Sequence, residues 1–200
     1  MASVYDFKPT FQRLLFPILR TLRALGITPN ALTIAAILGS AVVAWFVAQF
    51  PSPRVLLLLP AWLFVRMALN ALDGMMARTY DMTSPSGAIL NEVGDIVSDL
   101  ALYASLAWVE PRAMVVAFAF VVVAALTEFC GVLSQALGAG RRYDGPMGKS
   151  DRAFWIGAWG LLAAFVPQVL DALPWVLGTA SALGIVTCFR RVAPATRIPR

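Results

Sequence analysis

Six long apolar runs, each close to the length of a membrane-spanning helix, alternate along the chain with short polar turns. The runs cover residues 31–50, 54–79, 84–108, 112–138, 152–169 and 173–189. A spanning α-helix needs about 20 predominantly apolar residues. The pattern therefore predicts an all-α, six-transmembrane-helix integral membrane protein.

The segment before the first run has a different pattern, in which apolar side chains recur at helical spacing among cations. The apolar positions are Phe11, Leu14, Leu15, Ile18, Leu19 and Leu22, and the cations are Lys8, Arg13, Arg20 and Arg23. Such a segment is typical of an amphipathic helix that lies in the membrane interface. We expect residues 1–27 to form this interfacial helix and residues 28–200 to form one six-helix transmembrane domain.

Composition and charge agree with a membrane location. The chain is 60% hydrophobic and 14% charged, whereas a soluble domain is about 45–50% apolar and about 25% charged. In the six-span arrangement nearly all cations fall on one side, and only Arg54 and Arg112 fall on the other. The positive-inside rule makes the crowded side cytoplasmic. The excess of basic residues, with a net charge of +5, indicates contact with anionic lipid or phosphate rather than with nucleic acid. We expect a multi-pass protein of the cell inner membrane with its active site facing the cytoplasm.

The residue types that are scarce limit the possible chemistry. The sequence has no histidine, which excludes His-based triads and His-rich metal sites. Cys130 and Cys188 lie in apolar runs without CxxC spacing, so a structural zinc site is not supported. Proton transfer must use a carboxylate, Lys, Tyr or Cys.

Polar side chains interrupt the second and third apolar runs, although a charge deep in a span costs about 2.5–3.5 kcal/mol. They form one stripe per helix, with Arg66, Asn70, Asp73 and Ala77 on the second run and Asn91, Asp95 and Asp99 on the third. Two such stripes on neighbouring helices can converge on one cavity. Oxygen ligands without His or Cys suit a hard cation such as Mg²⁺ or Mn²⁺.

The spacing of these residues resembles the signature of the CDP-alcohol phosphotransferase family. It reads Asp73-Gly74-x2-Ala77-Arg78, then eight residues, Gly87, three residues, Asn91, three residues and Asp95. The segment Thr28-Pro29-Asn30 also resembles the family, and the likeness extends over the six-span layout. The chain differs from the family's signature at two positions, where it has Asn70 and Asn91 in place of Asp. An amide still offers an oxygen to a metal, but without charge.

The resemblance implies a metal-dependent phosphatidyltransferase of phospholipid biosynthesis, which moves a phosphatidyl group from CDP-diacylglycerol to an alcohol and releases CMP. Asp95 would be the catalytic general base. The enzyme's ligands for Mg²⁺ or Mn²⁺ would be Asn70, Asp73, Asn91 and Asp95. Asp99 would restore part of the negative charge that is lost where Asn replaces Asp. The CDP group would contact Asp73, Gly74, Ala77, Arg78 and Gly87. The family resemblance also implies a homodimer.

Basic residues near the cytoplasmic ends suggest how an acceptor could bind. We hypothesise that Lys149, Arg152 and Arg191 bind the phosphate of an acceptor such as glycerol 3-phosphate or inositol phosphate. The alternative is that they are ordinary positive-inside anchors. Glu128 could face the same cavity or pair with Arg66.

Two other functions fit part of the pattern. Buried carboxylates also mark ion paths, so a small ion- or proton-coupled transporter is one alternative. A non-catalytic homologue that binds CDP-lipid is another, suggested by Asn70 and Asn91. The transporter does not account for the spacing of the signature.

Overall fold

The computed structural model describes residues 8–197, and within that range every regular element is a helix. The long helices are α1 (Lys8–Ala24), α2 (Pro29–Gln49), α3 (Leu58–Thr79), α4 (Pro85–Ala104), α5 (Met114–Ala136), α6 (Lys149–Phe165) and α7 (Leu173–Val192). Short 3₁₀ turns lie at Pro53–Leu57, Ser105–Trp108, Pro111–Ala113, Pro167–Ala172 and Ala195–Arg197. The predicted all-α class is confirmed. Residues 1–7 of the expected N-terminal helix lie outside the described residues.

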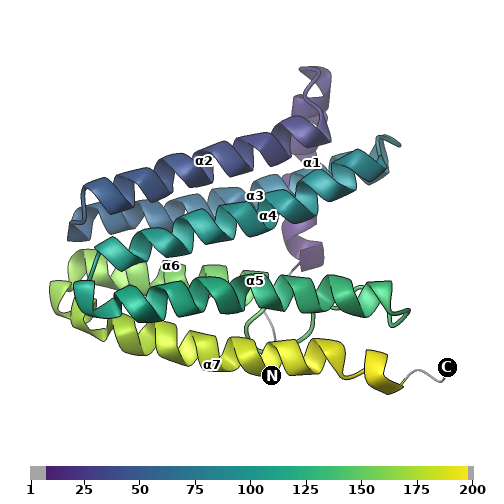
Figure 1. Ribbon diagram of the computed structural model, residues 1–200. Coiled ribbons are helices and arrows are strands. Elements are labelled where there is room, and N and C mark those ends of the chain that lie inside the picture. Colours follow the sequence, from purple (N-terminus) through teal and green to yellow (C-terminus); the bar gives the residue numbers. More distant parts are fainter. Residues whose placement is uncertain (1–7, 198–200) are drawn as a thin grey trace.

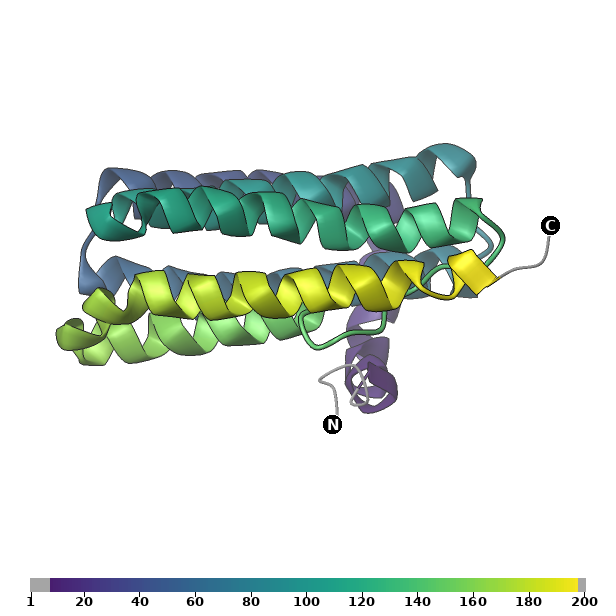
Figure 2. The ribbon, with the colours of Figure 1, turned by 60° about the horizontal axis from the view of Figure 1, so that its bottom comes forward.

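Helices α2 to α7 lie side by side in one bundle, and α1 crosses the bundle near one end (Figures 1 and 2). That end carries the start of α2, the end of α3 and the start of α4 (Figure 1). Helix α2 packs against both α3 and α4, and α5 packs against α7. The signature segment, which runs from α3 into α4, therefore lies at the end of the bundle that α1 crosses.

Capping residues set where the signature helices begin. The Thr28 side chain accepts a hydrogen bond from the Ala31 N–H at 3.2 Å, and the Ser84 side chain accepts one from the Gly87 N–H at 3.1 Å. In both helices proline takes the first position, where its missing N–H costs nothing. The turn from α3 to α4 uses Asp81 with φ 52°, a conformation that Asp tolerates better than most residues. Ser84, Pro85 and Asp81 therefore determine how the short connection turns from α3 into α4.

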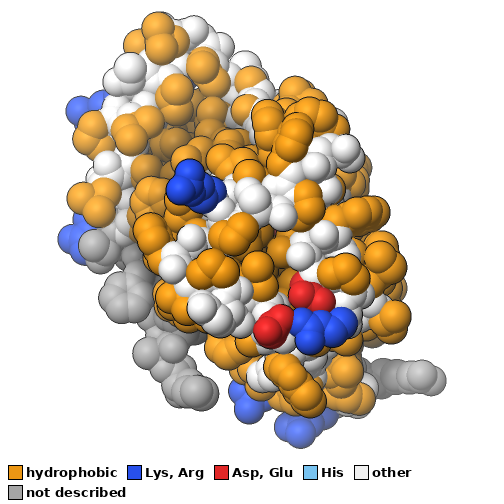
Figure 3. All heavy atoms as spheres, turned by 90° about the vertical axis from the view of Figure 1, so that its left-hand side faces the viewer, with side chains coloured by type: hydrophobic (Ala, Val, Ile, Leu, Met, Phe, Trp, Pro, Cys, Tyr) orange, Lys and Arg blue, Asp and Glu red, His pale blue; other side chains and the backbone are white. Residues whose placement is uncertain are grey.

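Four segments are long and apolar enough to cross a membrane: Pro29–Gln49, Pro53–Thr79, Pro111–Ala136 and Pro167–Arg197. Helices α4 and α6 run alongside them but carry the charged residues Asp95, Asp99 and Arg152. At the bundle end opposite α1, charged side chains are sparse among apolar ones (Figure 3). The chain is a multi-pass membrane protein with four candidate spans, and the expected number of six stays a prediction.

Small residues allow the helices to approach closely where they cross. A methyl group on Gly94 of α4 would lie 2.7 Å from Cδ1 of Ile37 on α2. On the other side of the bundle, a methyl group on Gly184 of α7 would likewise lie too close to Val123 of α5. Close packing through glycine is typical of membrane helices. The Gly94 contact brings α4 close to α2, and the Gly184 contact brings α7 close to α5.

Candidate functional site

The polar stripes of α3 and α4 do converge, and a third helix joins them. Asn70 Nδ2 donates to Asp95 Oδ1 at 2.9 Å, which links α3 to α4. Thr33 of α2 donates from Oγ1 to Asp73 Oδ2, also at 2.9 Å. Asp73 is buried and Asp95 is partly exposed. Each of the two signature carboxylates is thus oriented by a neutral donor on a neighbouring helix.

A cavity of about 150 Å³ opens beside Asp73 between the starts of α2 and α4 and the end of α3. Its walls include the predicted residues Asp73, Gly74, Ala77, Gly87 and Asn91, together with Pro29 and Asn30 of the segment that precedes the first span. The lack of a side chain at Gly87 keeps this space open, because a methyl group there would lie 3.0 Å from Oδ1 of Asn30. The cavity therefore brings signature residues of both helices around one space.

Arg78 lies beside Gly74, a residue of the cavity wall, and lines a second hollow. Its Nη1 would lie 3.2 Å from a methyl group on Gly74. The side chain also lines a hollow of about 650 Å³ between α1 and the end of α3, together with Gln12 and Arg13. Arg78 is exposed, so its guanidinium is available to an anion at this surface.

The side-chain oxygens of Asn70 and Asn91, the two residues that differ from the family's pattern, suit a cation. Oδ1 of Asn70 and Oδ1 of Asn91 are buried, yet neither accepts a hydrogen bond from any described residue. A buried unpaired acceptor costs about 1–3 kcal/mol, and a hard cation would satisfy it. Within residues 8–197 no three His, Cys, Asp or Glu side chains gather as a metal site. Unpaired amide oxygens of this kind are nevertheless suitable ligands for a hard divalent cation, and the complete set of ligands stays a prediction.

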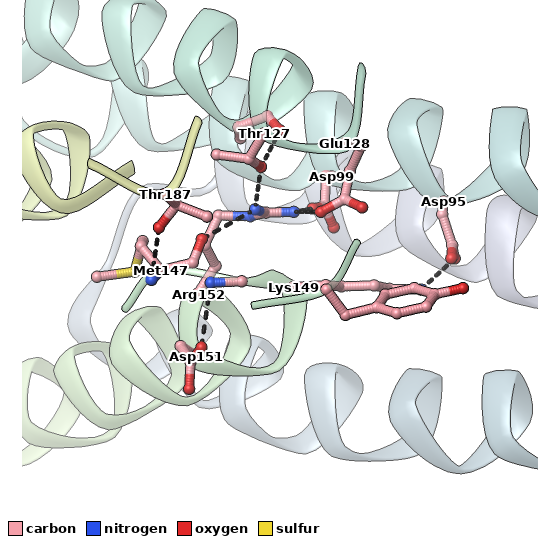
Figure 4. A network of polar contacts seen from close by, with 12 residues as sticks. Asp95, Asp99, Thr127, Glu128, Met147, Lys149, Asp151, Arg152 and Thr187 are labelled. Atoms are coloured by element: carbon pink, nitrogen blue, oxygen red, sulfur yellow. Dashed lines mark hydrogen bonds and ion pairs between the residues drawn. The ribbon is translucent and has the colours of Figure 1, made fainter. Parts of the chain in front are cut away.

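Asp95 also meets a cation of the protein. Lys149, the first residue of α6, forms an ion pair through Nζ with Asp95 Oδ1 (Figure 4). Arg66 of α3 lies 3.7 Å from the same oxygen and donates to the Asp95 backbone carbonyl at 2.9 Å. The predicted base is thus surrounded by positive charge and by an amide donor.

Deeper in the bundle, buried arginines and acids form a network that joins five helices. Arg152 donates to Asp99 Oδ2 at 2.7 Å, to Glu128 Oε1 at 3.0 Å and to Thr127 Oγ1 at 2.6 Å (Figure 4). Arg66 forms an ion pair with the other oxygen of Asp99, Oδ1. Both oxygens of Asp99 therefore have guanidinium partners. The prediction that Asp99 joins the metal ligands stays a prediction, and this arrangement does not favour it.

Arg191 of α7 completes the network. It lies 3.4 Å from Glu128 Oε1 and donates to the Thr127 carbonyl at 2.5 Å. Its other contacts are the backbone carbonyls of Asp144 at 3.2 Å and Tyr143 at 3.3 Å. Like Arg152, it is only 1% exposed. The three predicted acceptor-binding cations thus divide into two buried arginines and one partly exposed lysine.

The loop before α6 is tied to the same network by Arg141, which lies outside the spans. Arg141 pairs with Glu92 at 2.8 Å and with Glu128 at 3.3 Å. Burial disfavours its charge, but the hydrogen bond and charge of Glu92, with the charge of Glu128, raise the pKa of Arg141 above its ordinary value. The side chain holds this loop, and so Lys149 behind it, against α4 and α5.

Sequence reasoning named part of the cavity wall but missed the side chains that support it. Thr33 orients Asp73, and Thr127 orients Arg152, yet both occur in apolar runs where nothing in the sequence distinguishes them. The proposed pairing of Glu128 with Arg66 does not occur among the contacts described. Glu128 meets Arg141, Arg152 and Arg191 instead. Helical spacing within one run cannot show which residue of a distant helix lies opposite.

The structure is a helical membrane bundle with a cavity at one end that Asp73 and Asn91 help to line. The sequence model of the CDP-alcohol phosphatidyltransferase family matches residues 26–189. The chain therefore belongs to this family, as the signature predicted.

Two named proteins have sequences that are similar to this chain over most of its length. The inner membrane protein YnbA of Escherichia coli K12 is 41% identical over 189 residues, with 94% of each chain covered. The phosphatidylinositol phosphate synthase of Mycobacterium marinum is 28% identical over 207 residues, which cover 92% of this chain and 80% of the synthase.

Solved structures show the same fold. The Mycobacterium tuberculosis phosphatidylinositol phosphate synthase with CDP-DAG bound matches with a TM-score of 0.78 at 23% identity, over 94% of this chain and 96% of that one. The same synthase in complex with manganese and citrate matches with a TM-score of 0.76 at 23% identity, over 92% of this chain and 89% of that one.

Proposed function

We propose that this protein transfers a phosphatidyl group from CDP-diacylglycerol to a phosphorylated alcohol and releases CMP, as a step of phospholipid synthesis. The single observation that carries this proposal is the cavity in which Asp73, Gly74, Ala77, Gly87 and Asn91 meet. A CDP-linked lipid needs its acyl chains in the bilayer and its polar head at the surface. A cavity at the end of a membrane bundle, beside an exposed Arg78, suits that requirement.

The CDP group would lie in this cavity. Gly74 and Gly87 let the backbone approach the nucleotide closely, and Arg78 would pair with its phosphates. Asn70, Asp73, Asn91 and Asp95 would hold Mg²⁺ or Mn²⁺. The ion, when bound, supplies positive charge that stabilises the diphosphate and the leaving CMP. The manganese in the mycobacterial synthase structure supports a divalent cation but does not choose between the two.

Asp95 would act as general base. Its carboxylate would take the proton of the acceptor hydroxyl as that oxygen attacks the phosphorus bearing diacylglycerol. The partial exposure of Asp95 supports this role, because an acceptor arriving from water can reach it.

Lys149, Arg152 and Arg191 would recognise the acceptor phosphate. Two curated relatives named as phosphatidylinositol phosphate synthases favour a phosphorylated acceptor such as inositol phosphate, and glycerol 3-phosphate remains the other candidate. Lys149 would make the first contact. Arg152 and Arg191 would act from the buried side, where guanidinium groups suit phosphate.

We place the active site on the cytoplasmic side, with six spans, α1 in the interface and two chains in a homodimer. The concentration of cations at the α1 end and the family resemblance support this arrangement. Labelling of a cysteine introduced at position 54 or 141, in a chain whose Cys130 and Cys188 are replaced by alanine, would test the orientation. We expect only position 141 to react from the cytoplasmic side of inverted membrane vesicles.

The deciding experiment measures CMP release by purified protein with CDP-diacylglycerol and Mg²⁺ or Mn²⁺. The acceptors tested are glycerol 3-phosphate, inositol phosphate, inositol, serine and glycerol. We expect release with one phosphorylated acceptor and product formation in equal amount. Binding of CDP-diacylglycerol without release of CMP in the presence of any acceptor would instead support the non-catalytic homologue, which Asn70 and Asn91 favour.

A further inference from the structure

The hollow between α1 and the end of α3 lies outside the candidate active site. Its volume is about 650 Å³, within the range of about 300–1,000 Å³ that is usual for small-molecule sites. It shares no lining residue with the cavity beside Asp73. The residues that line it are Gln12, Arg13, Phe16, Met75, Arg78 and Thr79. The hollow is therefore a second, separate space at the α1 end of the bundle.

The walls of this hollow combine positive charge with apolar surface. Arg13 of α1 and Arg78 of α3 contribute two guanidinium groups, and none of the described lining residues is acidic. Phe16 and Met75 contribute the apolar part, and the Arg20 guanidinium lies 4.9 Å from the centre of the Phe16 ring. Guanidinium groups pair bidentately with phosphate. The walls therefore match a ligand that carries both a phosphate and a hydrocarbon portion.

The two apolar sides of α1 indicate where such a ligand would come from. One side packs on the bundle, where Leu19 lies in a buried cluster with Met76 of α3. The other side carries Leu14 and Ile18, which are exposed. In an interfacial helix an exposed apolar row enters the lipid while the cations stay near the headgroups. With α1 in the interface, the hollow opens at the level of the lipid phosphates.

We propose that the hollow between α1 and α3 binds the phosphate of an anionic phospholipid through Arg13 and Arg78, with Phe16 and Met75 against the apolar part of the lipid. This lipid is a second ligand, bound in addition to the CDP-diacylglycerol assigned to the cavity. Because its phosphate contacts cations on two helices, it fastens α1 to the end of α3. Arg78 has five N–H donors, so it can meet this phosphate as well as a nucleotide phosphate.

The first experiment measures binding of dioctanoyl phosphatidylglycerol to the purified protein by native mass spectrometry, without CDP-diacylglycerol or added metal. Arg13→Gln should weaken binding by roughly tenfold, the loss expected when a charge-assisted pair is removed. Arg23→Gln is the matched control, because it removes the same charge from α1 but its guanidinium lies over the ring of Tyr80. Equal effects of the two variants would overturn the site.

The second experiment separates the hollow from the cavity. Gly87 lines only the cavity, where its substitution by alanine would place a methyl group 3.0 Å from Asn30 Oδ1. Gly87→Ala should therefore bind phosphatidylglycerol as the wild type does. Weakening by Gly87→Ala and not by Arg13→Gln would mean that the lipid enters the cavity, which would contradict the proposal. Thermal unfolding in detergent checks that each variant is folded.

Two further probes identify the class of ligand. Dioctanoyl phosphatidylcholine has a phosphate but no net charge, and inorganic phosphate has charge but no acyl chain. Both should bind at least about tenfold more weakly than phosphatidylglycerol. Equal binding of phosphatidylcholine would remove the requirement for an anionic lipid, and equal binding of inorganic phosphate would assign the hollow to a free anion. Either result would overturn the proposal.

These outcomes are distinguishable from failure of the proposed function. None of the binding measurements requires turnover, so a protein that releases no CMP can still bind phosphatidylglycerol through Arg13. Conversely, a protein that transfers phosphatidyl groups but binds phosphatidylglycerol no better after Arg13 is restored from Gln would keep its assigned activity and lose the second lipid site.

Discussion

Arg152 donates to the Asp99 carboxylate at 2.7 Å although neither side chain is more than 5% exposed, so α6 and α4 are joined by a buried ion pair. Buried pairs are poor evidence of net stability, but breaking one leaves an uncompensated charge. The network around Arg152 explains why a chain this apolar keeps acids and arginines inside its bundle. It holds the helix that carries Lys149 against the helix that carries Asp95.

Removal of one partner from this pair should destabilise the protein strongly. For Asp99→Asn we expect a loss of about 3–5 kcal/mol, because Arg66 and Arg152 both lose their shared anion. The measurement is unfolding in detergent micelles. Asp171→Asn is the matched control, since Asp171 pairs with Arg112 on an exposed turn, where a pair contributes about 0–1 kcal/mol. Equal losses in the two variants would contradict a structural role for the network.

Substitution of the predicted base should remove catalysis but keep substrate binding. We expect Asp95→Asn to lower kcat by about 10²- to 10⁴-fold, while binding of CDP-diacylglycerol measured without the divalent cation stays within a few-fold because the cavity lies against Asp73. The checks are steady-state kinetics and a binding titration. Asp81→Asn, in the turn from α3 to α4, serves as the control. Retention of full activity by Asp95→Asn would rule out the assigned role.

Restoring the family's acids should strengthen metal binding. Asn70→Asp and Asn91→Asp each add a negative charge beside Asp73 and Asp95, and we expect Mn²⁺ to bind about tenfold more tightly, which is about 1.4 kcal/mol. Electron paramagnetic resonance of free Mn²⁺ measures this without reference to activity. Asn30→Asp is a useful comparison, because Asn30 lines the same cavity but has no assigned metal role. No gain from either substitution would mean that these amides do not face the ion.

A methyl group in the cavity should impair nucleotide binding. In Gly87→Ala the new carbon would lie 3.0 Å from Asn30 Oδ1 and from Ser84 Oγ, so we expect the KM for CDP-diacylglycerol to rise by roughly tenfold, or about 1.4 kcal/mol. Gly178→Ala in α7 is the matched helical control, since its methyl group would meet Val116 at an ordinary 3.9 Å. Similar kinetics for the two variants would count against the cavity as the nucleotide site.

Part of the site could be predicted because its residues are close together in the chain. Asp73, Gly74 and Ala77 occupy one turn and the next of a single helix, and Gly87, Asn91 and Asp95 follow at intervals of four. Helical geometry alone places each group on one face. The short connection capped by Ser84 then brings the two faces to the same end of the bundle. The positions of Thr33 and Glu128 could not be inferred in this way, since their partners lie 40 and 24 residues away.

The sequence by itself determined the apolar lengths of the helices, their starting caps, the family and the polar face of each signature helix, because all of these follow from local spacing and composition. Only the tertiary structure decided which charges meet. It paired Lys149 with Asp95, gave Asp99 two arginines and buried Arg152 and Arg191 around Glu128. The physical reason is that a charge in a bundle must find its partner across helices, and the rotation of each helix against its neighbours is set by packing of the whole fold.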